Sequence, residues 1–181
     1  MIRFIIAAIT ALLLASCNNE PTVQKYFVTK AEEKSFMAVD IAPSIIKTDK
    51  LKLTGEEKKA LDCLDHINVL VFKATNVNKP QFEKEKANVK SLLKTETYDE
   101  LIKFNSGQGG GSINTKGEGE HINEFLVYVH QKDNGFGLVR VTGQDMTPAN
   151  VMTIAGLMGK GGLDMDQLKP LQALMQSNNK K

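Results

Sequence analysis

The fold is decided by one stretch of the chain, residues 122–142, which reads INEFLVYVHQKDNGFGLVRVT. Its run Phe125–Val129 consists of apolar residues, most of them β-branched or aromatic, which is typical of a strand. Asp133-Asn134-Gly135 is a strong signal for a tight turn, and Phe136–Thr142 continues as the partner strand. The stretch therefore predicts an antiparallel hairpin, and we expect the strand over 122–131 to be central in the sheet.

The chain before this hairpin alternates strand-like and helix-like patterns. Strands are predicted over 36–41 and over 67–74, and their order leaves open whether they pair in parallel or are separated by another strand. Thr54-Gly55-Glu56-Glu57 fits a capping box, which predicts the start of a helix. A longer helix is expected after Pro80, because four apolar side chains fall on one stripe: Phe82, Val89, Leu92 and Leu93. Residues 26–29 fit either a strand or a short helical lead-in.

Glycine-rich segments separate the next elements. Tyr98, Leu101 and Ile102 have helical spacing, whereas the following residues 103–105 are expected to enter a strand. The segment 106–112 predicts a flexible hairpin loop because it contains four glycines. A short strand over 113–116 and a second glycine turn then lead into the central hairpin.

The last part of the chain predicts two helices. Thr147-Pro148 marks a helix start, followed by a core-facing stripe of Val151, Ile154, Ala155 and Met158. A glycine break over 159–162 precedes a short helix that begins near Pro170, in which Leu171, Leu174 and Met175 are apolar.

Together these elements predict a single α+β domain over residues 25–176, with a frayed tail over 177–181. We expect a twisted, mostly antiparallel sheet of about five or six strands, with the helices packed chiefly on one face. The helix over 148–158 is expected to pack on the sheet.

Composition excludes several classes of function. The 181 residues include 23 Lys and Arg against 21 Asp and Glu, a formal net charge of +2, and they form no basic block. Nucleic-acid binding is therefore not expected, since it requires a basic patch or stripe. Two cysteines are too few for a disulfide-rich miniprotein or a cysteine-rich zinc module.

The first 16 residues have the features of an export signal. Arg3 precedes an apolar run over 4–14 that spans only about 16 Å as a helix, about half of the hydrocarbon core, so a permanent transmembrane helix is disfavoured. Leu14-Ala15-Ser16-Cys17 resembles the bacterial lipobox, which implies cleavage between Ser16 and Cys17 and acylation of Cys17. The alternative is ordinary secretory cleavage that leaves Cys17 as a free thiol.

An acylated Cys17 would anchor the domain to membrane lipid without a second membrane segment. Residues 17–24 then form a tether that holds the domain close to the bilayer. Within the tether, Glu20 is the only charged residue, so the tether lacks the acidic cluster that resembles a surface-export signal. We therefore expect the lipid anchor to lie in the outer membrane of a bacterial envelope, with the domain facing the periplasm.

The order of the elements resembles a known family. Three segments carry the resemblance, together with two glycine-containing turns and a closing helix: Tyr98–Lys103, Ile122–Val127 and Leu138–Gly143. They are similar to lipoproteins of the domain of unknown function 4252 family, which are small envelope lipoproteins of the Bacteroidetes type. The resemblance is best over about residues 67–158. It implies no functional residue beyond the lipid-bearing Cys17.

Three histidines and two aspartates are the candidates for metal binding. Asp62, Asp65 and His66 have i, i+3, i+4 spacing, which on a helix would place them on one face, but a solvated helix end is the simpler interpretation. His121 and His130 are nine residues apart, so a continuous strand points them to opposite faces. We therefore assign no metal site.

The remaining candidates are a thiol and two glycine clusters. Once Cys17 is acylated, Cys63 is the free thiol, and its apolar neighbours favour a buried core residue over a nucleophile. The clusters 107–111 and 159–161 lack the strand-to-helix context or the Ser or Thr of a phosphate-binding loop. We therefore expect flexible turns there, with no bound nucleotide and no cofactor.

Three functions remain as hypotheses. A non-catalytic envelope module that binds or senses another macromolecule is favoured, through a sheet face, an edge strand, a helix groove or the loop over 106–112. A carrier of a small apolar ligand requires a large apolar pocket between sheet and helices. An enzyme requires polar residues that converge in a cleft, for example Asp62, Asp65 and His66.

Overall fold

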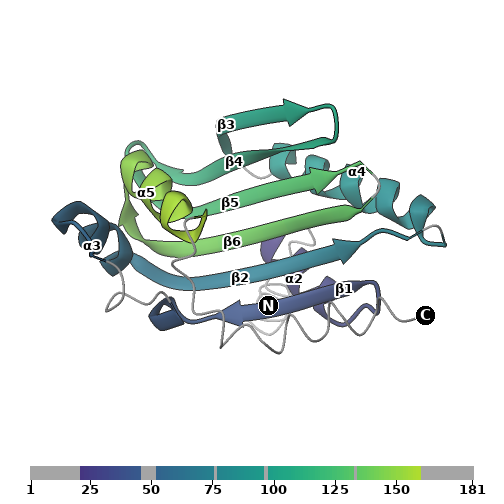
Figure 1. The fold of residues 1–181 in the computed structure, drawn as a ribbon, viewed down its shortest axis with the longest axis horizontal. Coiled ribbons are helices and arrows are strands. Elements are labelled where there is room, and N and C mark those ends of the chain that lie inside the picture. Colours follow the sequence, from purple (N-terminus) through teal and green to yellow (C-terminus); the bar gives the residue numbers. More distant parts are fainter. Residues whose placement is uncertain (1–20, 46–51, 76, 96–97, 133, 160–181) are drawn as a thin grey trace, which may run out of the picture.

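The computed structural model describes residues 21–45, 52–75, 77–95, 98–132 and 134–159. Six strands form one antiparallel sheet in the order β1-β2-β6-β5-β4-β3 (Figure 1). The strands are β1 Phe36–Ile41, β2 Leu64–Lys73, β3 Asp99–Ser106, β4 Gly109–Glu118, β5 His121–Gln131 and β6 Gly135–Met146. The helices are α2 Val23–Ala31, α3 Gly55–Asp62, α4 Lys79–Thr95 and α5 Pro148–Gly159, with a 3-10 turn η1 at Pro43–Ile45.

This architecture confirms the α+β class and the interior position of β5, which lies between β6 and β4. It also resolves the pairing of the first two strands. β1 and β2 are antiparallel neighbours, so the expectation that they pair in parallel or are separated by another strand is wrong. The segment between them, with η1 and α3, returns the chain to the adjacent position in the sheet instead of crossing it.

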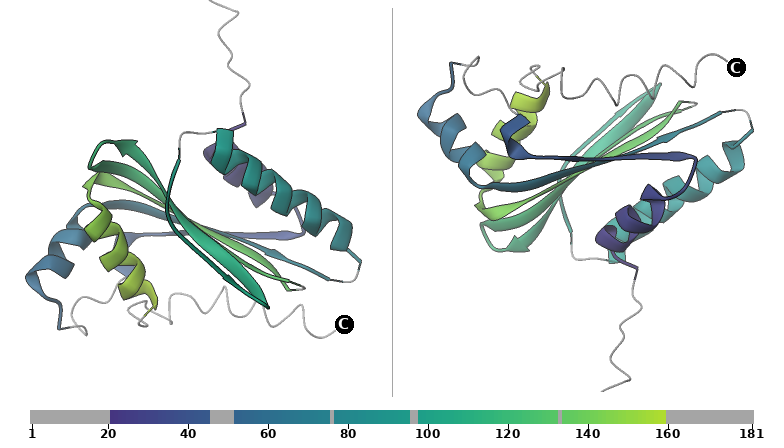
Figure 2. Two further views of the ribbon diagram at one scale, coloured as in Figure 1. Left: turned by 90° about the horizontal axis from the view of Figure 1, so that it is seen from above. Right: turned by 90° about the horizontal axis from the view of Figure 1, so that it is seen from below.

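The helices pack on both faces of the sheet, not chiefly on one. α3 and α5 lie on one face at one end, while α2 and α4 lie on the other face at the opposite end (Figure 2). Two buried clusters correspond to this arrangement. The first cluster lies under α3 and α5 and includes Ile67, Phe125, Val141, Val151 and Ile154. The second cluster lies under α2 and α4 and includes Leu70, Phe72, Leu126, Phe136 and Phe82.

The two clusters follow from alternation along the strands. Successive side chains of a strand point to opposite faces, so a strand that is apolar at every position needs cover on both sides. β2 places Ile67 in the first cluster and Leu70 in the second, and β5 divides Phe125 and Leu126 in the same way. The sequence of the central strands therefore requires two helical layers.

Local signals at the helix ends are confirmed. The predicted capping box of α3 is present, because Thr54 and Glu57 each accept a hydrogen bond from the other's backbone N–H. Thr147 caps α5 by accepting from the backbone N–H of Asn150 at 3.2 Å. Residues 26–29 belong to α2, and this helix begins at Val23, so the last two residues of the expected tether are helical.

The segment around residues 98–112 differs from the expectation. Leu101 and Ile102 lie in β3, where a bulge between Glu100 and Ile102 shifts the register and mimics helical spacing. The glycines at 109–111 are part of β4, and the turn is confined to residues 107–108. A Cβ on Gly109 would lie 2.1 Å from the carbonyl oxygen of His130, so the glycine permits a close strand approach instead of a flexible loop.

Several predictions fall outside the described residues. These are the export signal, Ser16 and Cys17, the last helix near Pro170, and the tail over 177–181. The side chain of Met158 also lies outside the described residues. Of the predicted α5 stripe, Val151 and Ile154 are fully buried, and Leu157 is buried beside them.

A matched pair of glycines on β6 tests the turn geometry. Gly135 has φ +127°, and a Cβ there would lie 1.9 Å from the carbonyl oxygen of Phe72, whereas a Cβ on Gly137 meets no atom within 4 Å. We expect Gly135→Ala to lower the free energy of unfolding by about 2 kcal/mol, because left-handed and crowded backbone tolerates no side chain. Gly137→Ala should leave it within about 1 kcal/mol of the parent. Urea denaturation measures the free energy of unfolding of the two variants, and an equal decrease in both would contradict the turn geometry at Gly135.

Candidate functional site

The face that carries α3 and α5 is apolar beyond the area that these helices cover. Cross-strand pairing arranges its side chains in rows. The row under the helices is buried and consists of Ile41, Ile67, Val141 and Phe125. The next row is half-buried and consists of Val39, Val69, Val139 and Val127.

The third row lies outside the cover of the helices and is still apolar. It runs across β1, β2, β6 and β5 through Met37, Val71, Gly137 and Val129, and continues over Gly111 to Phe104. Val129 is 42% exposed and Phe104 is 48% exposed. We call this row the open apolar half-face: Met37, Val71, Gly137, Val129 and Phe104.

The open apolar half-face is hollowed. A depression of about 830 Å³ lies over it and over the neighbouring strand ends, with Met37, Val71 and Val129 among the lining residues. Gly137 contributes to the hollow because open space lies where a side chain would be. Polar residues also line it, including Ser35, Thr75, Asn78, Gln131 and Asn134. Of the described lining residues, two are lysines, Lys34 and Lys73, and none is an aspartate or a glutamate.

The uncovered half of the opposite face has the reverse character. There the Asn68 amide donates to the Asp40 carboxylate at 2.6 Å. Arg140 makes a two-pronged ion pair with Glu124, at 2.9 and 2.7 Å, and the Tyr98 hydroxyl donates to the same carboxylate. One uncovered half of the sheet is thus polar, as a solvated face should be, and the other is apolar. The apolar half is the candidate functional surface.

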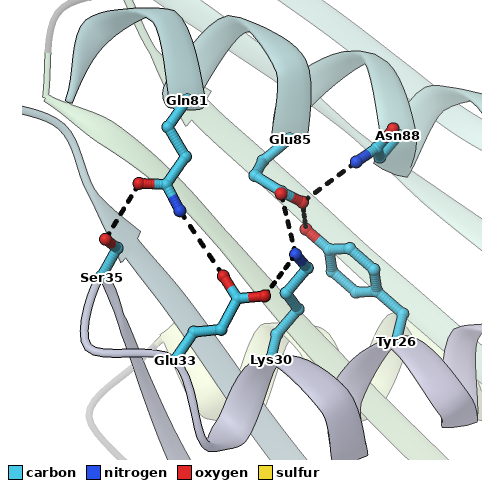
Figure 3. A network of polar contacts seen from close by, with 7 residues as sticks. All are labelled: Tyr26, Lys30, Glu33, Ser35, Gln81, Glu85 and Asn88. Atoms are coloured by element: carbon cyan, nitrogen blue, oxygen red, sulfur yellow. Dashed lines mark hydrogen bonds and ion pairs between the residues drawn. The ribbon is translucent and has the colours of Figure 1, made fainter.

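A second polar feature lies between α2 and α4 (Figure 3). Glu85 is only 3% exposed and lies on the apolar stripe of α4 between Phe82 and Val89. Lys30 donates to one Glu85 oxygen at 2.8 Å, and the Tyr26 hydroxyl donates to the other at 2.9 Å. Asn88 donates to that second oxygen at 3.2 Å. Lys30 also pairs with Glu33 at 2.7 Å.

The network extends from Lys30 and Glu33 to the start of β1. Ser35 donates to the side-chain oxygen of Gln81 at 3.0 Å, and the Gln81 amide reaches Glu33 at 3.5 Å (Figure 3). The seven side chains of Figure 3 therefore connect α2, the segment before β1, and α4.

The charged groups of the network hold one another ionised. Burial alone would raise the pKa of Glu85, but the hydrogen bonds from Lys30, Tyr26 and Asn88 outweigh it and lower this pKa below its ordinary value. Burial alone would lower the pKa of Lys30, but its bonds to Glu33 and Glu85 raise it. Burial and the bond to Glu85 raise the pKa of Tyr26, which therefore stays protonated. Both oxygens of Glu85 are engaged, so this network fastens α2 to α4 and offers no free group to a substrate.

The proposed helical face of Asp62, Asp65 and His66 does not exist. α3 ends at Asp62 with Cys63 as its cap, and β2 begins at Leu64. Asp65 and His66 are therefore neighbours on β2, both exposed, at a register shift between Leu64 and His66. Within the described ranges, no three His, Cys, Asp or Glu side chains come close enough to hold a metal ion.

The other candidate residues are also dispersed. His121 lies 3.2 Å from Asp145 at the exposed start of β5. His130 lies near the other end of that strand, with its ring edge-to-face against Tyr128 at 5.4 Å. Burial and the nearby Lys86 and Lys90 lower the pKa of His130. Cys63 packs against the first cluster at the end of α3, as expected of a core residue, but it is only half-buried, and its thiol donates to the Lys59 carbonyl at 3.2 Å.

Comparison with protein families identifies a match over most of the described chain. A family model described as a domain of unknown function, DUF4252, matches residues 26–154. The chain belongs to this family. Searches of curated proteins and of solved structures each found no match. In the part of the chain that the structure describes, no helix is long and apolar enough to span a membrane.

The matched range of the DUF4252 family includes every strand and most of each helix, and thus both candidate features. A sheet face was among the binding surfaces considered from the sequence, but neither this half-face nor the network was predicted. The signal for the network was Glu85, which interrupts the apolar stripe of α4 three residues after Phe82 and four before Val89. The signal for the open apolar half-face was the unbroken apolar run of β2, Val69-Leu70-Val71-Phe72, which needs more cover than the predicted helices supply.

We expect Glu85→Gln to lower the free energy of unfolding by about 3 kcal/mol at neutral pH, because it removes the charge that Lys30, itself half-buried, pairs with in the interior. Glu83→Gln is the matched control. Glu83 lies on the same helix, is 58% exposed and pairs with Lys86 only at 3.5 Å, so its loss should stay below about 1 kcal/mol.

The difference in stability between the parent protein and Glu85→Gln is expected to depend on pH. The pKa of Glu85 is lower in the folded state than in the unfolded chain, so its stabilisation is present above the unfolded value, near about 4.3, and is lost as pH falls through the folded value. The difference in stability between the parent and Glu85→Gln should therefore shrink below about pH 4. A difference that is constant from pH 7 to pH 3 in denaturant titrations would contradict an ionised Glu85.

Proposed function

We propose that this protein is a membrane-anchored envelope lipoprotein that acts as a non-catalytic interaction module. Its binding surface is the open apolar half-face. The observation that carries the proposal is the contrast between the two uncovered halves of the sheet: Arg140 and Glu124 lie on one, whereas Val129 and Phe104 are exposed on the other. Exposed contiguous apolar surface is costly in water and marks sites of association.

The position of the anchor supports this use of the surface. The lipid would be attached at Cys17, five residues before Thr22, which caps α2. Those residues reach at most about 18 Å when extended. α2 packs on the face opposite the open apolar half-face, and its first residue, Val23, is 2% exposed in the second cluster (Figure 2). A domain held on this side presents the open apolar half-face away from the bilayer, where a partner in the periplasm reaches it.

The shape of the hollow favours a macromolecule over a small ligand. Its volume of about 830 Å³ lies within the range of small-molecule sites, which keeps a carrier of an apolar ligand as the second candidate. However, such sites enclose most of the ligand surface. The described lining residues of this hollow come from the sheet and the adjoining strand ends, and none of them belongs to a helix, so the described part of the chain leaves a small molecule exposed on one side.

The anchor is tested at Cys17. We expect Cys17→Ala to leave the precursor unprocessed and to abolish labelling by a fatty-acid probe, because the thiol is the site of acylation. Cys63→Ala is the control and should be processed and labelled as the parent is. Persistent labelling of the Cys17→Ala protein would show that the lipobox interpretation is wrong.

The binding surface is tested by photo-crosslinking in cells. A photoreactive residue at Val129, on the open apolar half-face, should give a discrete adduct with an envelope protein. The same residue at Ala38, exposed on the opposite face, should not. Equal adducts at both positions, or none at Val129, would contradict the proposal. A small apolar molecule that co-purifies with the parent and is lost in Val129→Asp would favour the carrier instead.

A further inference from the structure

We infer that the segment 163–175 of this same chain occupies the open apolar half-face until a partner displaces it. This inference rests on the proposed function, because it concerns the regulation of that surface. Residues 160–181 lie outside the described residues, and two facts bear on them: their sequence and the place where α5 ends.

The sequence of the segment fits an apolar surface. It reads LDMDQLKPLQALM and carries six apolar side chains at intervals of one to three residues, besides Pro170 and Ala173: Leu163, Met165, Leu168, Leu171, Leu174 and Met175. Acidic, amide and basic residues fill the positions between them. Such a pattern needs an apolar partner surface to be stable in water.

The end of α5 lies on the correct face. Val151 and Ile154 of α5 pack in the first cluster, which shares its face with the open apolar half-face. α5 runs from the end of the sheet toward its middle (Figure 1). The chain therefore leaves Gly159 on the side of the sheet where the uncovered row begins.

The lengths also agree. The half-buried row and the uncovered row are about 7 Å apart, because they are two residues apart along each strand. The three residues between Gly159 and Leu163 reach this far. Five strands, β1 to β4 in sheet order, are about 19 Å wide at ~4.8 Å per strand. A segment of 13 residues is about 20 Å long even as a helix, so it covers the row from Met37 on β1 to Gly111 on β4.

Charge favours the same occupant. The described charged residues that line the hollow are Lys34 and Lys73. The segment brings Asp164 and Asp166 against one cation, Lys169, a net charge of −1. In addition, a segment attached to the domain has an effective concentration in the millimolar range, so a free partner competes only if it binds more tightly.

The experiment measures how fast a maleimide modifies a cysteine on the surface, in the full chain in detergent. The reporter is Val129→Cys in a Cys63→Ala background. We expect Leu168→Asp/Leu171→Asp to accelerate the modification at least several-fold, because the segment no longer covers the surface. Gln167→Asp/Gln172→Asp adds the same charge at polar positions and should leave the rate unchanged. A second reporter, Ala38→Cys, lies on the opposite face and should react at one rate in all chains.

The outcomes separate the occupants. Equal rates at Val129→Cys with and without the leucine substitutions would overturn the inference. Protection that disappears on dilution would also overturn it, since a second copy would then be the occupant. If the rates are equal while Val129 still crosslinks to an envelope protein in cells, this inference fails and the proposed function stands. If that adduct is missing as well, the proposed function fails on its own test.

Discussion

The structure depends on one constraint, which is that its central strands are apolar on both faces. β2, β6 and β5 each contribute buried side chains to both clusters. Burial of apolar surface is worth about 25 cal/mol per Å², so both faces need cover. The four helices of the described residues supply it in two pairs, and each pair covers one half of one face (Figure 2). Two half-faces of the sheet remain without a described helix over them, and only one of the two is polar.

This constraint also explains which predictions succeeded. Signals that act within a few residues were sufficient for β1, β2, β5 and β6, for the capping box at Thr54 and for the cap at Thr147. The failures involve partners that are far apart in the sequence. Whether Gly109–Gly111 form a loop or a strand depends on the approach of β5, and the side of the sheet that a helix covers depends on the whole topology. The register shift at Leu101 likewise arises from pairing with β4.

The candidate surface was harder to predict than the fold for the same reason. An apolar row becomes visible only when β1, β2, β6 and β5 are aligned, since Met37, Val71 and Val129 come from three distant segments. Glu85 was visible as an interruption of a stripe, but its partners Tyr26 and Lys30 are 59 and 55 residues away. Each feature thus left a sign in the sequence, the apolar run of β2 and Glu85 in α4, but neither sign identified the residues that lie beside it in the fold.

The network at Glu85 matters for function through position more than through stability. A buried ion pair contributes little net stability, because the desolvation of its charges offsets their attraction. Its hydrogen bonds nevertheless demand one geometry, with Lys30 and Tyr26 of α2 both on the same carboxylate. α2 is the first described helix, so with the lipid anchor proposed at Cys17 the way α2 docks would determine which face of the sheet is turned toward the membrane.

The edges of the sheet narrow the way in which a partner approaches. β3 is an edge strand that carries Asp99, Glu100 and Lys103 and is bulged at Leu101. Charges and bulges on an edge disfavour the addition of a further strand. The other edge, β1, is only six residues long and includes Asp40. Strand addition at either edge is thus opposed by the sequence, whereas nothing charged interrupts the row from Met37 to Phe104. Recognition through the face of the sheet is therefore the mode that this fold favours, and an amphipathic helix or segment laid across the strands is the shape that fits it.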